Sequence, residues 1–297
     1  MFPTLKRQLN LVDKKLATAK YNEDRSLVLF KYSRKVMYDN LWGKYPELYE
    51  CRGHVYDTVS EDIVQAAPRK CFNLGENDWW SKISLNTKVQ VHKKYNGFLA
   101  NATMHNGKIL VTTTGSFDST FQVLAEQMIK EYLEDFQATS IITEDSTLSF
   151  EICHKSDPHI VTEKEGVYPL CWRQKNNGLV VPFYKNLIAE MHLSDVLTLA
   201  EQVSDMEGFM LYGLNDVCKV KTHTYIVKKK LMRMTDEKID LMYDDPSYIK
   251  QSLPYPDLWF LIYQILMLDK DKWKNLTEQD RRAILDLALH TKGYKIE

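Results

Sequence analysis

The most informative stretch of the sequence is KVQVHKKYNGFLA, residues 88–100. Apolar and polar residues alternate up to Lys94, which is typical of a strand with one buried face. A second apolar run begins immediately after Gly97, so another strand should follow. A lysine in this position is expected to point into a cavity between strands. A glycine beside it lets a ligand approach the backbone closely.

Short runs rich in β-branched and aromatic residues occur on both sides of this stretch, and they predict further strands. These runs cover residues 26–33, 52–59, 108–114, 141–144, 147–153, 167–174, 179–184, 208–213 and 216–222. Two dipeptides, Asn106-Gly107 and Asn177-Gly178, predict hairpin turns.

Helical periodicity marks the remaining segments. The first 20 residues should form a helix, with Leu5, Leu9, Val12 and Leu16 at helical spacing. Another helix should begin near Asp118, and a further one at Ser194. The apolar face of the helix near Asp118 is expected to consist of Phe121, Leu124, Met128 and Tyr132.

Strand patterns stop after about residue 230, and three helical segments are expected there. The last should open with a capping box at Thr277 and Asp280. The sequence therefore predicts an α+β protein. An antiparallel-sheet-rich domain at residues 1–233 is followed by a small C-terminal helical domain at residues 234–297.

Composition excludes several classes of protein. The chain has 297 residues, 39 basic and 40 acidic side chains and 44% hydrophobic residues, which excludes disorder and collagen-like repeats. Its formal charge of −1 means that nucleic-acid binding would need a local basic patch.

The expected compartment follows from what the sequence lacks. Five cysteines without a C-x-x-C pair predict reduced thiols in the cytoplasm. The N-terminal 15 residues lack the apolar stretch of a secretory signal. The apolar run 258–268 is shorter than the roughly 20 residues of a membrane span, so no membrane association is expected.

Lys94 has a competing interpretation as an ordinary lysine at a strand end. The same Lys-x-x-Gly pattern occurs at Lys175, where a polar hairpin turn predicts a solvated side chain. Context distinguishes Lys94 from Lys175, because Lys94 ends an alternating strand and an apolar run follows its glycine. An ordinary strand-end lysine stays open as the other interpretation of Lys94.

A second basic feature is Lys219-Val220-Lys221, where alternation places both lysines on one face of a strand. Residues 219–233 carry six basic side chains and no acidic one. An anion-binding site is one interpretation. The other is a solvated edge strand whose lysines prevent edge pairing.

Two carboxylates lie in apolar strand settings, Glu151 and Glu207. A buried acid needs a structural cation, a ligand hydroxyl or a metal as partner. Arg52, Lys70 and Phe72 precede the Lys94 strand. A guanidinium, an ammonium and a phenyl ring could together hold a phosphate and a base.

The order of these segments resembles the covalent nucleotidyltransferase superfamily, and more closely the RNA ligase 1 family of bacteriophages. The segments are ECRG (50–53), FNLGEN (72–77), KYNG (94–97), TGS (114–116), SFE (149–151), EGF (207–209) and KVK (219–221). The first two are specific to this branch. The resemblance covers nearly all of residues 25–250.

The resemblance implies a role for each matching residue. Lys94 would be the nucleophile that becomes linked to AMP. The residues implied in nucleotide and phosphate binding are Tyr32, Arg52, Lys70, Phe72, Gly97, Glu151, Glu207, Lys219 and Lys221, with Glu151 on the ribose hydroxyl. Glu207 and Asp236 would contact a metal, and Tyr225 also matches a position that the family uses. The cofactors would be ATP and Mg²⁺ or Mn²⁺.

The implied activity is ATP-dependent RNA ligation in RNA repair. It would join 5′-phosphate and 3′-hydroxyl RNA ends, including those of cleaved tRNA, with no obligate protein partner. Alternatives are a DNA ligase, a capping-type nucleotidyltransferase or a non-catalytic RNA-binding module. One departure is Thr114, which stands where the family has a basic residue. The short tail is another, and it leaves tRNA specificity open.

Overall fold

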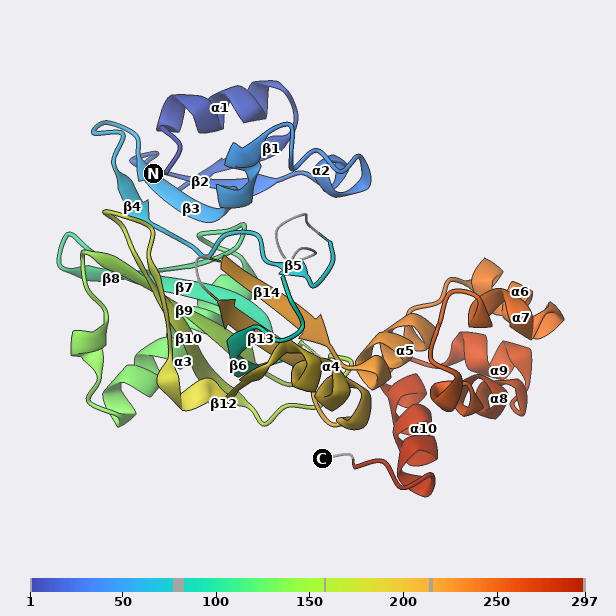
Figure 1. Cartoon of the computed structure of the whole chain (residues 1–297). Helices are drawn as coiled ribbons and strands as arrows, with labels where there is room; N and C mark the ends of the chain where they lie inside the picture. Colours follow the sequence, from blue (N-terminus) through green and yellow to red (C-terminus); the bar gives the residue numbers. More distant parts are fainter. Residues whose placement is uncertain (1, 77–82, 158, 214–215, 296–297) are drawn as a thin grey trace. The chain divides into compact units, whose positions relative to one another are not determined.

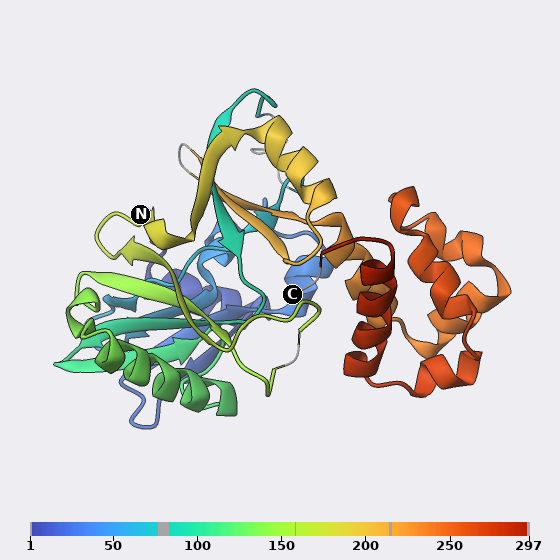
Figure 2. The same cartoon turned by 90° about the horizontal axis from the view of Figure 1, so that it is seen from below.

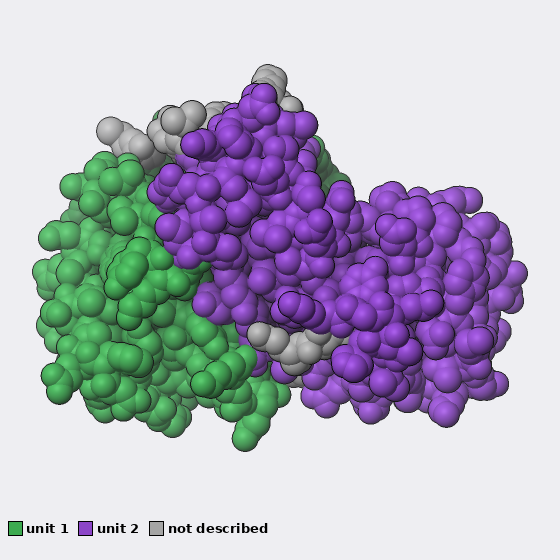
Figure 3. All heavy atoms as spheres, turned by 60° about the horizontal axis from the view of Figure 1, so that its bottom comes forward, with its two compact units in different colours: residues 1–71, 97–157, 164–186 green, residues 72–96, 158–163, 187–297 purple. Residues whose placement is uncertain are grey.

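The computed structural model describes residues 2–76, 83–157, 159–213 and 216–295, and it confirms an α+β fold rich in antiparallel sheet (Figure 1). The chain divides into two compact units (Figure 3). Unit 1 comprises residues 1–71, 97–157 and 164–186, and unit 2 comprises residues 72–96, 158–163 and 187–297. The predicted boundary at residue 233 stays a prediction.

Unit 1 begins with a helix and a four-stranded antiparallel sheet of order β1-β2-β3-β4. Their bounds are α1 Leu5–Asp13, β1 Ala17–Tyr21, β2 Leu27–Tyr32, α2 Arg34–Tyr38, η1 Pro46–Glu50, β3 Arg52–Asp57 and β4 Ile63–Gln65. The expected helix over the first 20 residues is too long. Lys15 adopts φ 58°, and the next residues pair with β2 from Ala17 to Tyr21. The strand ladder therefore ends the helix.

The second sheet of unit 1 has the order β11-β10-β9-β7-β8. Its strands are β7 Phe98–His105, β8 Lys108–Thr113, β9 Ser146–Cys153, β10 Gly166–Gln174 and β11 Val180–Pro182. Both predicted hairpins are confirmed, with φ 50° at Asn106, 71° at Gly107 and 74° at Gly178. The strand expected at residues 141–144 is wrong, because residues 139–141 form a 3₁₀ turn, η3.

Helix α3, Thr120–Asp135, lies along this second sheet (Figure 2). Its buried side chains belong to the same apolar core as those of the sheet. Its start near Asp118 is confirmed, but its inward face lies one residue away from the predicted one. The buried residues are Gln122, Ala125, Ile129 and Leu133. Gln122 is buried because its Nε2 donates to the backbone oxygen of Val111 at 2.9 Å.

Unit 2 contains the sheet β12-β6-β13-β14-β5, in which the β14–β5 pair is parallel and the other pairs among the described residues are antiparallel. Its strands are β5 Phe72–Asn73, β6 Lys88–Lys94, β12 Leu187–His192, β13 Gly208–Gly213 and β14 Asp216–Lys221. Helix α4, Leu193–Gln202, packs on one face through Leu193, Val196 and Ala200.

The C-terminal segment of unit 2 is helical. Its elements are α5 His223–Met232, α6 Asp236–Asp244, α7 Pro246–Lys250, η5 Pro256–Leu258, α8 Phe260–Leu266, α9 Lys270–Asn275 and α10 Glu278–Thr291. Three helical segments were expected here, and the described residues after 234 form five α-helices. Pro246 is the first residue of α7 and Pro256 is the first residue of η5, so each proline begins a new helical element. The capping box at Thr277 and Asp280 is confirmed.

These helices surround one apolar core, in which Trp273 is fully buried. Ile262 belongs to the core, and Trp259 and Leu266 pack against it. In the described part of the chain, no helix is both long and apolar enough to span a membrane.

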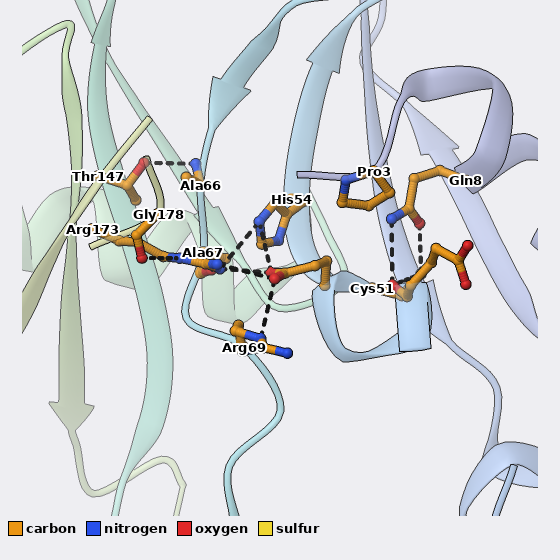
Figure 4. Close-up of polar contacts among 12 residues, drawn as sticks. Pro3, Gln8, Cys51, His54, Ala66, Ala67, Arg69, Thr147, Arg173 and Gly178 are labelled. Carbon is orange, nitrogen blue, oxygen red and sulfur yellow. Dashed lines mark hydrogen bonds and ion pairs between the residues drawn. The ribbon is translucent and has the colours of Figure 1, made fainter. Parts of the chain in front are cut away.

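A buried polar network joins β3, β10 and the turn before β3 in unit 1 (Figure 4). Arg173 donates to both carboxylate oxygens of Glu50, at 2.6 and 3.0 Å. The Nε2 atom of His54 lies 3.2 Å from the same carboxylate. Burial lowers the pKa of His54 to about 3, although the charge of Glu50 opposes this shift. His54 is therefore neutral in the folded protein.

The neutral His54 predicts a loss of stability in mild acid. Its pKa is lower in the folded state than the value of about 6.5 in an unfolded chain, so unfolding takes up a proton below about pH 6.5. Its contribution is complete above that pH and falls as the pH drops, by at most about 1.4 kcal/mol per pH unit. His92 and His223 act in the same direction, because burial also lowers their pKa values.

We therefore expect the free energy of unfolding to decrease between pH 7.5 and 5.5, measured by urea denaturation. The variant His54→Asn should show a smaller decrease, and the exposed His290→Asn serves as the control. An equal pH dependence in wild type and His54→Asn would contradict the neutral buried histidine.

Candidate functional site

Strand register in unit 2 places three predicted residues side by side. Gly208 at the start of β13 pairs with Lys94 at the end of β6 and with Lys221 at the end of β14. Both lysines therefore reach the same end of three neighbouring strands, on either side of the Glu207-Gly208 dipeptide. The prediction that Lys94 ends its strand is confirmed.

Glu207 joins the two lysines through its carboxylate. Its Oε2 lies 2.8 Å from Nζ of Lys94, and its Oε1 lies 3.2 Å from Nζ of Lys221. The exposed fractions of the three side chains are 20% for Lys94, 7% for Glu207 and 17% for Lys221. Burial would raise the pKa of Glu207, but the charges of Lys94 and Lys221 outweigh it and hold this pKa below its ordinary value. The carboxylate is therefore ionised, and the cluster carries a net positive charge.

Gly208 is required for this arrangement because β13 and β14 approach closely there. A Cβ atom on residue 208 would lie 2.1 Å from the backbone oxygen of Val220. The backbone φ of 152° is also one that side-chain-bearing residues rarely adopt. The glycine thus permits the short path from Glu207 to the two lysines.

Two further side chains support the cluster. Asn96, in the amide orientation that satisfies both of its ends, donates to Oε2 of Glu207 at 3.1 Å and accepts from the backbone nitrogen of Val161 at 2.9 Å. The ring of Tyr225 lies beneath Lys221, whose Nζ is 4.5 Å from the ring centroid. Both contacts restrict the charged groups to one geometry.

The basic strand β14 is an inner strand of the sheet and lies between β13 and the short β5. Lys219 pairs with Asn73 of β5, and Phe72, which is buried, pairs with Cys218. The interpretation of residues 219–221 as a solvated edge is therefore disfavoured.

Asp236, the other predicted metal ligand, is exposed at the first residue of α6. Among the described residues, no group of three or more histidine, cysteine, aspartate or glutamate side chains could hold a metal.

Unit 1 brings a second set of predicted residues together. The backbone nitrogen of Tyr32 donates to the oxygen of Cys51, beside Arg52. The Tyr32 ring packs edge-on against Trp42, with centroids 5.0 Å apart, and Nζ of Lys70 lies 5.8 Å from the Trp42 ring. Tyr32 and Lys70 thus share an aromatic neighbour that the sequence had not singled out.

Gly97 and Glu151 also meet within unit 1. The backbone nitrogen of Gly97 donates to Oε1 of Glu151 at 2.9 Å. A Cβ on residue 97 would lie 2.2 Å from the backbone oxygen of Ile152, so the close approach expected of this glycine is made by strand β9. Glu151 lies on the same face as Ser149 and Cys153, as strand alternation requires.

Lys31 was missed by sequence reasoning, and it lies beside the segment that contains Thr114. A Cβ on Gly115 would lie 3.0 Å from Nζ of Lys31. The ammonium group therefore supplies a positive charge next to the Thr114-Gly115-Ser116 turn. Its position next to Tyr32 in the sequence was the only available signal.

No protein-family model matches the chain, and no curated protein matches its sequence. Solved structures of similar fold do exist. An archaeal ATP-dependent RNA ligase, form 1, has a TM-score of 0.53 at 13% identity and covers 94% of this chain and 75% of its own. Form 2 of an archaeal ATP-dependent RNA ligase has a TM-score of 0.52 at 14% identity, with 97% and 76% covered.

At this identity the likeness concerns the fold. The chain has an α+β fold similar to that of ATP-dependent RNA ligases, as the sequence motifs predict. The resemblance to the bacteriophage branch stays a prediction.

The close approach at Gly208 predicts that Gly208→Ala destabilises the protein. The added methyl group would clash with the backbone of β14, which cannot move as a flexible side chain can. Overpacking of this kind costs about 1–3 kcal/mol. Gly43→Ala is the matched control, since nothing lies within 4 Å of the position that its added methyl group would take. Equal thermal denaturation of the two variants would refute the argument.

The shared carboxylate predicts that Glu207→Gln lowers the pKa of Lys94. The substitution removes a negative charge 2.8 Å from the ammonium and leaves the positive Lys221 in place. The pKa can be followed by NMR of ¹³C-methylated lysines, with Lys94→Arg identifying the signal. An unchanged or raised pKa would show that Glu207 does not stabilise the ammonium.

Proposed function

We propose that this protein is an ATP-dependent RNA ligase that works through a lysine–AMP intermediate at Lys94. The observation that supports this most strongly is the half-buried lysine at a strand end, next to Glu207 and Lys221, in a fold similar to that of ATP-dependent RNA ligases.

In the first step, Nζ of Lys94 attacks the α-phosphorus of ATP. A P–N bond forms, the P–O bond to pyrophosphate breaks, and pyrophosphate leaves. An ammonium group cannot attack, so Lys94 must first lose a proton, and Oε2 of Glu207 is an acceptor 2.8 Å away. The positive charge of Lys221 favours the neutral amine and stabilises the negative charge that develops on the phosphate.

In the second step, AMP is transferred from Lys94 to a 5′-phosphate of RNA, and a phosphoanhydride replaces the P–N bond. In the third, a 3′-hydroxyl attacks the activated 5′-phosphate and AMP leaves. Lys94 is the nucleophile only in the first step, and this order of events makes the proposal testable.

Other residues have roles that follow from the family resemblance. Arg52, Lys70 and Lys219 would bind phosphates, Phe72 and Tyr32 would contact the nucleotide, and Glu151 would accept from a ribose hydroxyl. Mg²⁺ or Mn²⁺ would neutralise phosphate charge when bound, near Glu207 and Asp236. Lys31 would supply the charge that Thr114 lacks.

The proposed substrates are RNA ends, including those of cleaved tRNA, and the proposed location is the cytoplasm. The helices of residues 234–297 are the part to which we assign RNA choice. After the KVK strand, the described residues from 222 to 295 contain helices and no strand. A non-catalytic RNA-binding module would not need the Lys94–Glu207 pair.

The proposal predicts that the protein becomes covalently labelled when incubated with α-labelled ATP, and not with GTP. Lys94→Ala should abolish the label. Lys175→Ala, the matched Lys-x-x-Gly lysine, should retain it. Label that persists in Lys94→Ala and disappears in Lys175→Ala would overturn the assignment.

The same variants separate nucleotide activation from joining. Lys94→Ala should retain part of the ability to join pre-adenylylated RNA to a 3′-hydroxyl end with Mg²⁺ and without ATP, because the AMP is already on the RNA. Loss of this reaction in a folded Lys94→Ala protein would mean that the lysine is also needed in the third step.

A further inference from the structure

Unit 2 contains a cleft of ≈ 830 Å³ that extends from β14 along helix α5 to the start of α6. This volume is within the range of about 300–1,000 Å³ that is typical of ligand sites. One end is lined by Lys219 and Lys221, which the proposed function already uses. The other end has no role in that proposal.

The cleft is strongly basic. Its lining includes two acidic side chains, Glu76 and Glu201, and six cationic ones, Lys219, Lys221, Lys229, Lys230, Arg233 and Lys238. Arg233 forms an ion pair with Glu278. Among the described residues, no carboxylate lies within ion-pair distance of Lys229, Lys230 or Lys238. Lys221 forms an ion pair with Glu207. Lys229, Lys230 and Lys238 are therefore the cations of the cleft whose charge is not offset by a nearby carboxylate among the described residues.

The pKa values of Lys229 and Lys230 are lowered, as expected for partly buried side chains where positive charges lie close together. Burial and then the charges of neighbours such as Lys221 and Arg233 lower the pKa of Lys229. Burial and then the charge of Lys238 lower the pKa of Lys230. An anion placed between these groups would relieve the repulsion.

Aromatic side chains line the same cleft. The ring of Tyr225 lies 4.5 Å from Nζ of Lys221 and 5.8 Å from that of Lys229. Tyr255 packs against His223 with ring centroids 4.1 Å apart. A basic groove with aromatic rings is typical of proteins that bind single-stranded nucleic acid.

The length of this row of basic side chains favours a single-stranded nucleic acid, rather than one nucleotide, as the ligand of the cleft. Helix α5 has 10 residues and is therefore about 15 Å long, with Lys221 before it and Lys229, Lys230 and Arg233 at its far end. Cations in the last turn also stabilise a helix dipole, so a solvated helix end is the competing explanation.

We propose that this cleft binds the phosphate backbone of single-stranded RNA, with Lys230 and Lys238 contacting phosphates beyond the reacting end. The inference rests on the proposed function, because it assigns the substrate strand of that reaction to α5 and α6. The backbone runs from Lys219 and Lys221 toward the C-terminal helices.

The test uses the full chain and a short 5′-phosphorylated, fluorescently labelled oligoribonucleotide. Its affinity is measured by anisotropy at several salt concentrations for wild type, Lys230→Ala, Lys238→Ala and the double variant. Lys130→Ala, an exposed lysine of α3 paired with Glu126, is the matched control. Each lost phosphate contact should reduce the slope of log affinity against log salt by about 0.7. Label from α-labelled ATP at Lys94 should stay at the wild-type level.

Lys230 also donates to the backbone oxygen of Ser252, so its loss could affect folding, and thermal denaturation of each variant checks this. If Lys230→Ala is unstable, the test rests on Lys238→Ala, because Lys238 is exposed. Slopes equal to those of wild type and Lys130→Ala would overturn the inference. Loss of Lys94 labelling with unchanged RNA slopes would also overturn it, by assigning the cleft to ATP. A wild-type protein that never labels but shows the slope change would refute the ligase proposal and leave RNA binding standing.

Discussion

The candidate site depends on one interaction, the sharing of the Glu207 carboxylate between Lys94 and Lys221. Two half-buried ammonium groups repel each other, and the carboxylate makes their proximity tolerable. Removing one partner of a buried ion pair typically costs about 3–5 kcal/mol. The cluster therefore stabilises the ends of three strands and retains a net positive charge. This net positive charge is also the charge that a phosphate-binding site needs.

This interaction requires a strand register without slippage. Lys94, Gly208 and Lys221 are paired across β6, β13 and β14, and a shift by one residue would turn each side chain to the other face. The missing Cβ of Gly208 lets β14 approach closely enough for both lysines to reach Glu207. Lys94 of the first motif and the Glu207-Gly208 dipeptide of the second therefore belong to one cluster, although the two motifs are far apart in the sequence.

Local features of the fold could be predicted from the sequence, and features that depend on distant partners could not. The end of β6 at Lys94 and both Asn-Gly hairpins follow from neighbouring residues. The partner of Lys94 lies 113 residues away, so the ion pair with Glu207 is not encoded in any local pattern. The inward face of α3 was wrong for the same reason, since the carbonyl of Val111 allows Gln122 to be buried. Lys31 was missed because it lies in β2, far in the sequence from the turn after β8 that contains Gly115.

The net charge of the whole chain does not reveal the basic cleft on which the proposed RNA binding depends. The chain carries a formal charge of −1, yet the cleft along α5 gathers six cationic side chains against two acidic ones. At physiological ionic strength, charges separated by more than about 8 Å are largely screened, so a phosphate responds to the nearby lysines and hardly to the total. Acidic residues elsewhere can then keep the whole chain nearly neutral without weakening the cleft. Local arrangement, fixed by β14 and α5, therefore determines which anion this protein can hold.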